Sequence, residues 1–306
     1  MSSPESLNEA GPSIALQDAA PIGLPSRAAH DPAADPGPAP APPAAGRQRR
    51  LQAARSVGLG VLGFGVLVLA WQLAAAARPA LPSPAATFRQ LRLDLASPLH
   101  DNGPNDKGIF LLLEASLGKV FFGFGVAALV GIPLGFALGA VKGIKRSTNP
   151  IVQVLRPVSP LAWYPILLVL FKNATKASVL TIAITALWPT LLNTATGVSG
   201  LPQDHRDVAR VFRFSRPKYL FRVLLPYSLS SIITGLRLSM GISWMVIVAT
   251  EMLAGSSGIG FHIWDSYNNN NLAEVVVAIA FIGLLGLCLD QVLIRLVRRF
   301  DYSGAR

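Results

Sequence analysis

Hydrophobic residues fall along this chain in long blocks, separated by shorter polar segments. Six blocks reach the roughly 20 residues that an α-helix needs to cross a hydrocarbon layer of about 30 Å. They are Val57–Ala77, Leu113–Val141, Ile151–Phe171, Ala177–Val198, Tyr227–Leu253 and Ala273–Val297. This pattern predicts an all-α fold, a polytopic membrane bundle with six transmembrane helices.

The segments outside these blocks have their own patterns. Residues 1–50 are rich in Pro and Ala, cannot bury enough apolar surface to fold, and are predicted to form a disordered tail. No apolar core follows a short basic start, so the tail is not a signal peptide. Residues 51–306 form the predicted transmembrane domain, whose polar, proline-rich linker 78–112 is expected to carry a short interfacial helix at Thr87–Ala96.

The polar segment Gly255–Asn271 is predicted to be an outer loop. Its Gly and Asn residues favour turns, and it carries three aromatic residues, Phe261, Trp264 and Tyr267. We expect these aromatics to anchor the loop at the membrane interface, or to form a rim where a partner outside the membrane docks.

Composition and charge narrow the class of protein. The sequence of 306 residues is 51% hydrophobic and 14% charged, as expected for a membrane protein. Its net charge of +11 does not indicate nucleic-acid binding, because the basic residues lie between apolar runs and not on a soluble domain. The single cysteine, Cys288, excludes an intramolecular disulfide and a cysteine-based metal site.

Lysine and arginine residues predict the orientation in the membrane. If the N-terminus is cytoplasmic, the inner segments hold 18 of them and the outer segments hold 6. Because cytoplasmic loops carry the excess of basic residues, both termini and the loop 203–226 are predicted to be cytoplasmic. The expected location is a bacterial inner membrane.

Small residues and prolines indicate how the spans pack. Gly131, Gly135 and Gly139 are spaced four residues apart in the second span, which lets another helix approach closely. Pro133, Pro160 and Pro165 predict kinked or partly unwound helices that are buried in protein or line a cavity. Broken spans of this kind favour a transporter over a membrane scaffold.

Enzyme and nucleotide-binding motifs find no support. The pattern Gly58-x-Gly60-x-x-Gly63 lies inside a membrane span without a preceding strand, and no phosphate-binding G-x-x-x-x-G-K-[ST] motif occurs. The four histidines are far apart in the sequence, so neither a zinc site nor a catalytic triad is predicted.

Charged residues inside the spans are the candidates for a translocation pathway. Among them we single out the cations Lys119, Arg156 and Arg237, together with Glu251. A cation at the centre of a bilayer costs about 3 kcal/mol, so such residues usually face the interior of a bundle. They could line a positive path that suits an anion, form salt bridges between helices, or extend to the interface.

The loop 203–226 is the most charged segment of the C-terminal half. Val208, Val211 and Phe212 recur at helical spacing, which predicts an amphipathic helix between two membrane spans. Such a helix could insert into a groove on a partner protein, or it could lie on the lipid surface, where basic residues suit anionic headgroups.

This loop resembles the EAA loop of ABC-importer permeases. It reads Asp207-Val208-Ala209 for EAA, has Arg213 where the family has Gly, and ends at Leu224-Leu225-Pro226. The stretches RPVSPLAWYP, WPTLLNTATGV, GLRLSMGISWMVIVATEML and GIGFHIWDSYN are similar to the nitrate/sulfonate/bicarbonate branch, and most closely to its nitrate permeases. The similarity runs from about Lys107 to Asp301.

The resemblance implies the assembly and its substrate. It implies a six-helix subunit that forms a dimer, two ATPase subunits below it and a periplasmic substrate-binding protein above. Contacts to the ATPase are then expected from Asp207, Val208, Ala209, Arg210, Val211, Phe212 and Arg213. The chain itself would be no enzyme and bind no cofactor, because ATP and Mg²⁺ belong to the ATPase subunits.

The implied substrate is a small oxyanion: nitrate, or nitrite or cyanate. The alternatives within the family are aliphatic sulfonate or taurine, and bicarbonate. An alternative from another class is a secondary anion transporter or channel that works without an ATPase.

Overall fold

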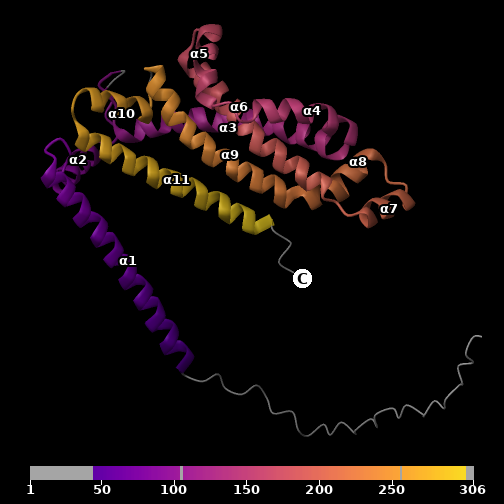
Figure 1. The fold of residues 1–306 in the computed structure, drawn as a ribbon, viewed down its shortest axis with the longest axis horizontal. Helices are drawn as coiled ribbons and strands as arrows, with labels where there is room; N and C mark the ends of the chain where they lie inside the picture. The colour runs from indigo at the N-terminus through magenta and orange to yellow at the C-terminus, as the bar shows by residue number, and fades with distance from the viewer. Residues whose placement is uncertain (1–43, 104–105, 256, 301–306) are drawn as a thin grey trace, which may run out of the picture. The chain divides into compact units, whose positions relative to one another are not determined.

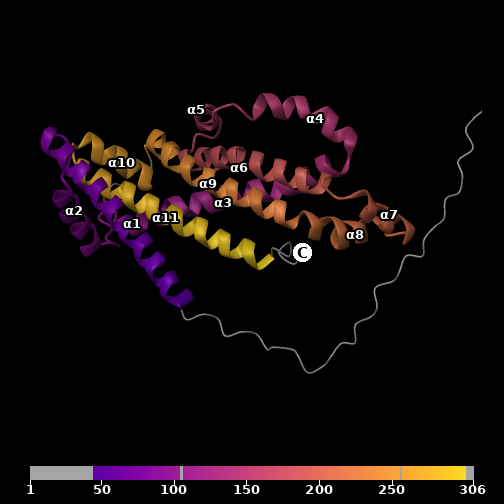
Figure 2. The same cartoon turned by 60° about the horizontal axis from the view of Figure 1, so that its bottom comes forward.

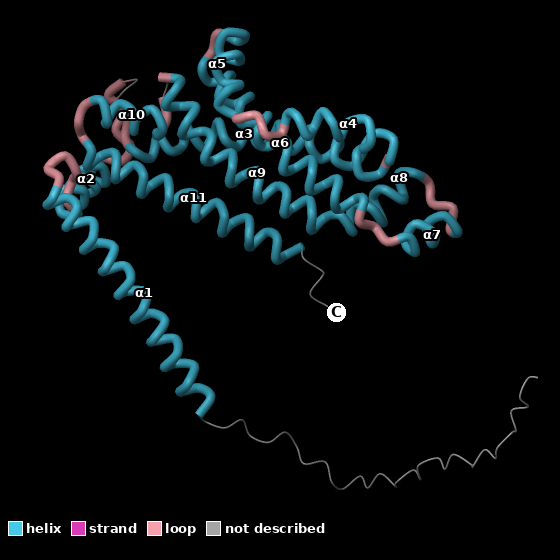
Figure 3. Tube along the Cα trace, viewed as in Figure 1, coloured by secondary structure: helices cyan, strands magenta, loops and turns pink. Residues whose placement is uncertain are grey.

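The computed structural model describes residues 44–103, 106–255 and 257–300, and confirms the all-α prediction (Figures 1 and 3). The helices are α1 Ala44–Ala77, α2 Pro84–Ala96, α3 Ile109–Ala140, α4 Lys142–Leu155, α5 Pro160–Phe171, α6 Ala174–Ser199, α7 Gln203–Val211, α8 Arg216–Tyr219, a π-helical turn η1 Leu220–Leu224, α9 Leu225–Ala254, α10 Ile259–Asn268 and α11 Leu272–Phe300. The chain divides within α1 into two compact units, and the helix packing and the cavities described below belong to the unit Leu62–Arg306.

Two helices near the N-terminus begin earlier in the sequence than predicted. Helix α1 begins at Ala44, so residues 44–50 of the predicted disordered tail are helical. Ala, Gln and Arg are strong helix formers, and here they extend the membrane helix beyond its apolar part. Residues 1–43 lie outside the described part of the chain. A helix is present where one was predicted at 87–96, as part of α2, which begins at Pro84. The side chain of Ser83 caps α2 by accepting a hydrogen bond from Ala86 N at 3.2 Å.

Within the described part of the chain, five helices are long and apolar enough to cross a membrane, and a bent pair, α4 and α5, makes six if it counts as one span. The predicted third span, Ile151–Phe171, is therefore not one continuous helix, because its two halves meet at 91°. Pro157 and Pro160 explain the break: neither can donate a backbone hydrogen bond, and Ser159 is held in an extended conformation by the proline that follows it.

The long helices α3, α6 and α9 form the packed centre of the bundle, and they lie side by side in both views (Figure 2). The glycine stripe on α3 was predicted to let another helix approach closely, and that helix is α6. A Cβ atom added at Gly135 would lie 2.6 Å from Thr194 Cβ, and one at Gly139 would lie 2.6 Å from Val198 Cβ. These two glycines therefore set the distance between α3 and α6.

The segment Gly255–Asn271, predicted to be a loop, contains the helix α10. The prediction was wrong because the Gly and Asn residues at its ends favour turns, whereas the residues between them form a helix that packs against its neighbours in the chain, α9 and α11, and against α3. Within α10 the rings of Trp264 and Tyr267 stack with centroids 5.8 Å apart.

Replacing Gly135 with valine should destabilise the bundle. The added atoms would meet α6 backbone and side-chain atoms that cannot move without separating the helices, at a cost of about 1–3 kcal/mol. Thermal unfolding in detergent measures the effect. Gly125→Val is the matched control, because a Cβ at Gly125 meets no atom within 4 Å. Equal midpoints for the two variants would contradict the packing role of the stripe.

Candidate translocation site and coupling helix

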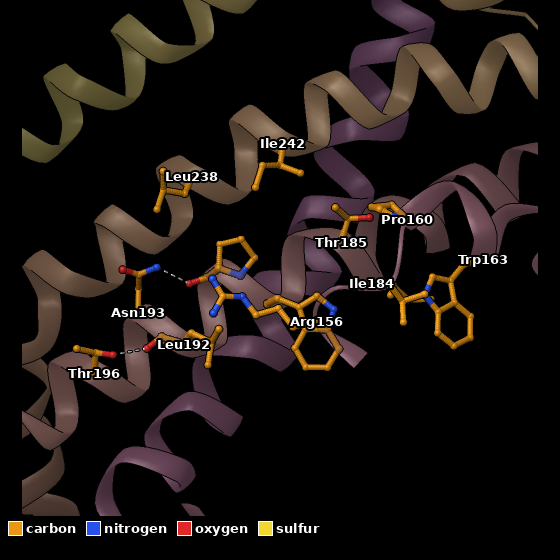
Figure 4. Close-up of a pocket in the computed structure, with 13 residues that line it drawn as sticks. Arg156, Pro160, Trp163, Ile184, Thr185, Leu192, Asn193, Thr196, Leu238 and Ile242 are labelled. Atoms are coloured by element: carbon orange, nitrogen blue, oxygen red, sulfur yellow. Dashed lines mark hydrogen bonds between the residues drawn. The ribbon is translucent and has the colours of Figure 1, made fainter. Parts of the chain in front are cut away.

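A cavity of about 460 Å³ lies beside the break between α4 and α5 (Figure 4). Arg156 at the end of α4, Pro160 and Trp163 from the first turn of α5, Asn193 and Thr196 from α6, and Leu238 and Ile242 from α9 line it. Figure 4 shows Arg156 among the side chains that α6 and α9 contribute. The cavity is thus bounded by the bent span and by two helices of the packed centre.

The electrostatics of this cavity suit an anion. Arg156 is the only charged residue in its lining, and no carboxylate accompanies it there. The N-terminus of α5 begins at the same place, and its N-cap residue, Ser159, makes no side-chain capping bond. The partial positive charge of a helix N-terminus therefore adds to the guanidinium charge. In transporters, half-helix N-termini of broken spans point in the same way at anionic substrate groups.

Several polar groups of the lining are already engaged with the backbone of α6. Asn193 Nδ2 donates to the Pro189 carbonyl at 2.8 Å, and Thr196 Oγ1 donates to the Leu192 carbonyl at 2.8 Å. Thr185 Oγ1 donates likewise to the Thr181 carbonyl. The Arg156 guanidinium is consequently the charged donor that the lining can offer to an anion, beside the indole N–H groups of Trp163 and Trp188.

A second cavity, of about 660 Å³, lies between the first turns of α3 and α6, and its charges are largely balanced. Its lining holds three cations, Lys107, Lys119 and Lys176, and two carboxylates, Asp101 and Glu114. Lys107 Nζ lies 3.4 Å from Asp101 Oδ2, and Lys119 forms the ion pair described next. This cavity presents less uncompensated positive charge than the cavity at Arg156.

The structure brings together two of the four predicted pathway residues. Lys119 Nζ, on α3, lies 2.9 Å from Glu251 Oε1, on α9, and the two side chains are only 8% and 0% exposed. Ser116 Oγ donates to the same carboxylate at 2.8 Å, and Gly260 N donates to Glu251 Oε2 at 3.0 Å. Lys119 also donates to the Ser257 carbonyl. The carboxylate is thus fully hydrogen-bonded, and it occupies the N-terminus of α10.

Two glycines make room for this arrangement. Gly258 has φ 143°, and a Cβ added there would overlap the Glu251 carboxylate; one added at Gly260 would overlap the Val248 carbonyl. Glycine is therefore required at position 258 by the Glu251 carboxylate and at position 260 by the Val248 carbonyl. Sequence reasoning named Glu251 but missed Ser116 and the two glycines as its partners.

Arg237 is paired in another place. Its Nε and Nη2 donate to the two carboxylate oxygens of Asp290, on α11, at 2.7 and 3.0 Å. Arg237 does not line the cavity at Arg156, although its neighbour Leu238 does. Asp290 was missed in the sequence, yet an acidic residue inside the last span is a usable signal for the partner of an intramembrane cation.

Helix α7 carries the residues expected to contact an ATPase. Val208, Val211 and Phe212 are 54%, 79% and 70% exposed and form an unpartnered apolar ridge. Asp207 and Arg210 pair at 2.8 Å along the helix. Ala209, in contrast, is buried, so it packs against the rest of the subunit and does not belong to the exposed surface of α7.

Arg213 occupies the conformation that usually requires glycine. Its φ is 47°, in the left-handed region. Arg213 N donates to the Arg210 carbonyl and Phe214 N to the Ala209 carbonyl, both at 3.0 Å, which is the Schellman arrangement at a helix C-terminus. The turn expected of the family's glycine is therefore present, with an arginine in its place.

Comparison with known proteins identifies the family. The model of the family described as "Binding-protein-dependent transport system inner membrane component" matches residues 131–302, more than half of the chain. The chain belongs to this family of ABC-importer permeases.

Relatives and solved structures agree with this assignment. The permease is 42% identical to the nitrate import permease protein NrtB of Synechocystis sp. over 75% of this chain and 84% of that protein. It is 43% identical to the bicarbonate transport system permease protein CmpB of Synechococcus elongatus over 76% and 84%. The inward-facing MetNI methionine ABC transporter shares the fold, with a TM-score of 0.56 at 15% identity over 61% of this chain and 93% of the other. The permease is thus a membrane transport component of the nitrate and bicarbonate type.

A polar hollow of the permease is lined by His100 and His262, which are far apart in the sequence. Asp94, Asp106 and Glu274 also line it. The His100 ring lies 2.6 Å from the Ser97 carbonyl and 2.9 Å from Asp106 Oδ1, at hydrogen-bond distance from both. Both contacts raise the pKa of His100, and the contact with the Ser97 carbonyl contributes more. Hydrogen bonds from Asn102 and then His100 lower the pKa of Asp106. Among the described residues, no group of these side chains has the arrangement of a metal site.

The stability lost on replacing both residues of the Lys119–Glu251 pair should be smaller than the sum of the losses for the two single substitutions. Lys119→Met leaves the Glu251 carboxylate in a dry site without its cation, and removal of one partner from a buried pair costs about 3–5 kcal/mol. The double variant K119M/E251L should lose less stability than the two single variants together. Thermal unfolding of the purified permease measures both, and strictly additive losses would contradict the coupling.

Proposed function

We propose that this permease translocates a small oxyanion, with nitrate as the first candidate, in an ATP-driven importer. The observation that carries the proposal is the cavity in which Arg156 and the N-terminus of α5 meet without a carboxylate. A single guanidinium per chain suits a monoanion better than a dianion. Membership of the nitrate and bicarbonate type of permease supports the same class of substrate.

The partners that we propose follow from the family. Two ATPase subunits would bind and hydrolyse ATP with Mg²⁺, a periplasmic protein would deliver the anion, and a second copy of this chain would complete the membrane part. The chain itself is proposed to bind no cofactor and to perform no catalysis. Bicarbonate and aliphatic sulfonate are the other substrates to compare, since the binding protein performs much of the selection.

In this proposal α7 is the coupling helix, facing the cytoplasm together with both termini. Its ridge Val208, Val211 and Phe212 would insert into a groove on the ATPase, as amphipathic helices do in other complexes. Closure of the ATPase subunits would then push α7, and the continuous helical stretch from α8 through η1 into α9 would carry the motion into the membrane. Among the four charged residues, we place Arg156 on the anion path, and Lys119, Glu251 and Arg237 beside it as residues that hold the surrounding helices.

Replacing Arg156 with glutamine should reduce uptake of labelled nitrate by about tenfold or more at equal membrane abundance, because hydrogen bonds to charged groups contribute about 1.5–3 kcal/mol. Uptake is measured in proteoliposomes that contain the permease, its ATPase subunits and its binding protein. Bicarbonate and taurine are compared in the same preparation, and faster uptake of either would replace nitrate as the substrate.

Two control variants sharpen this measurement. Arg156→Lys keeps the positive charge and should retain part of the uptake, whereas Arg146→Gln removes an exposed cation of α4 outside the cavity and should leave uptake unchanged. Wild-type uptake by R156Q would remove Arg156 from the path. Uptake by the permease alone, without ATPase subunits, would favour a secondary transporter or channel.

A cysteine at Val211 should crosslink to an ATPase subunit that carries single surface cysteines around its groove. Val211 is 79% exposed on the ridge, so the substitution adds a reactive group without disturbing packing. Ala209→Cys is the matched control, because the buried Ala209 side chain cannot reach a partner. Crosslinking at both positions, or at neither in an intact complex, would contradict the proposed docking face.

A further inference from the structure

A basic cavity of about 300 Å³ lies between α7 and α8, apart from the ridge that we assign to the ATPase. It is lined by Arg206, Ala209, Arg210, Phe214, Arg216 and Tyr219. Three guanidinium groups therefore surround a hollow with aromatic walls. No carboxylate belongs to its lining.

The positive charge of this cavity is poorly compensated within the described part of the chain. Arg210 pairs with Asp207, but no ion pair there engages Arg206 or Arg216. Arg206 Nε is shielded from solvent and has no hydrogen-bond partner. Lys218 adds a further cation, 4.4 Å from the centre of the Phe214 ring. A buried donor without a partner is costly, so an anionic acceptor is expected beside it.

The position of the cavity on α7 argues against the ATPase as the source of that acceptor. Arg206 and Arg210 are four residues apart and share one face of the helix. The exposed ridge Val208, Val211 and Phe212 occupies the opposite face. A partner that receives the ridge would therefore lie on the far side of α7 from the cavity.

The cavity instead lies at the ends of two membrane spans. Arg206 Nη2 donates at 3.3 Å to the carbonyl of Ser199, the last residue of α6, whose 26 residues extend about 39 Å. That length is close to the 40–45 Å of a bilayer with its headgroups. Arg216 and Tyr219 begin the next candidate span, and tyrosine is typical of the headgroup region.

We propose that this cavity binds the phosphate of an anionic lipid headgroup in the leaflet that faces α7. Arg206 and Arg216 would donate to the phosphate oxygens, and Tyr219 and Phe214 would pack against the glycerol. Inorganic phosphate shares this chemistry, and the experiment separates the two sources. The proposal goes beyond transport, since it concerns the permease alone and does not require ATPase subunits or substrate.

The test is the lipid that co-purifies with the full-length permease from mixed vesicles of phosphatidylglycerol and phosphatidylcholine, measured by native mass spectrometry. Wild-type permease should retain phosphatidylglycerol preferentially. The double variant R206Q/R216Q should reduce that preference by roughly tenfold, because each basic residue near an anionic membrane surface contributes appreciably to lipid attraction.

Two further variants keep the result interpretable. R213Q/R222Q removes the same charge from the same loop outside the cavity and should retain the preference. R206K/R216K keeps both charges and should restore most of it, which a simple folding defect would not allow. Equal retention of both lipids by wild type, or equal losses in the two glutamine variants, would overturn the proposal. Displacement of bound lipid by millimolar inorganic phosphate, with equal stabilisation by phosphate alone, would assign the cavity to a free anion instead.

Discussion

The hydrocarbon layer supplies no hydrogen bonds, and this constraint decides where charge and irregular backbone can stand in the permease. The Glu251 carboxylate is its clearest expression. It is completely buried, yet it accepts hydrogen bonds from Lys119 and Ser116 on α3 and from Gly260 at the start of α10. One acidic group thereby joins three helices and accepts the Gly260 N–H, while the Ile259 N–H donates to Ser116 Oγ, so the first N–H groups of α10 have partners.

Arg156, unlike Glu251, has no oppositely charged side chain beside it in the lining of its cavity. The backbone around it is broken, its span bends by 91°, and its guanidinium faces a cavity without a carboxylate. Lys119 and Arg237, in contrast, each meet a carboxylate at hydrogen-bond distance. A cation that the fold neutralises holds helices together, whereas one that the fold leaves without a counter-charge beside a cavity is available to an anion that passes through. This difference is what separates a structural charge from a candidate transport residue.

Much of the fold follows from patterns that act locally. Apolar runs predicted the membrane spans, and the Gly131, Gly135 and Gly139 spacing predicted a close contact with another helix, which the structure identifies as α6. The prolines around Arg156 indicated a broken span, but not its angle, which depends on how α5 packs against α6. Helix α10 was missed because the Gly and Asn residues at its ends favour turns; the carboxylate at its N-terminus comes from Glu251 near the end of the preceding helix, α9. The partners Glu251 and Lys119 are 132 residues apart, so no local pattern could join them.

In the loop between α6 and α9, one face of α7 packs against the ends of the membrane spans and the other face is exposed. Its turn is closed by Arg213 in a left-handed conformation, with the two backbone bonds that a glycine would make there. A non-glycine residue adopts this conformation at some energetic cost, so the hairpin must be held by other contacts. Burial of Ala209 and the bond from Arg206 to the end of α6 supply them. Because these contacts fix α7 against the ends of the spans on one face, its apolar ridge is left free on the other, and a force applied to that ridge would be transmitted to the membrane helices rather than absorbed by the loop.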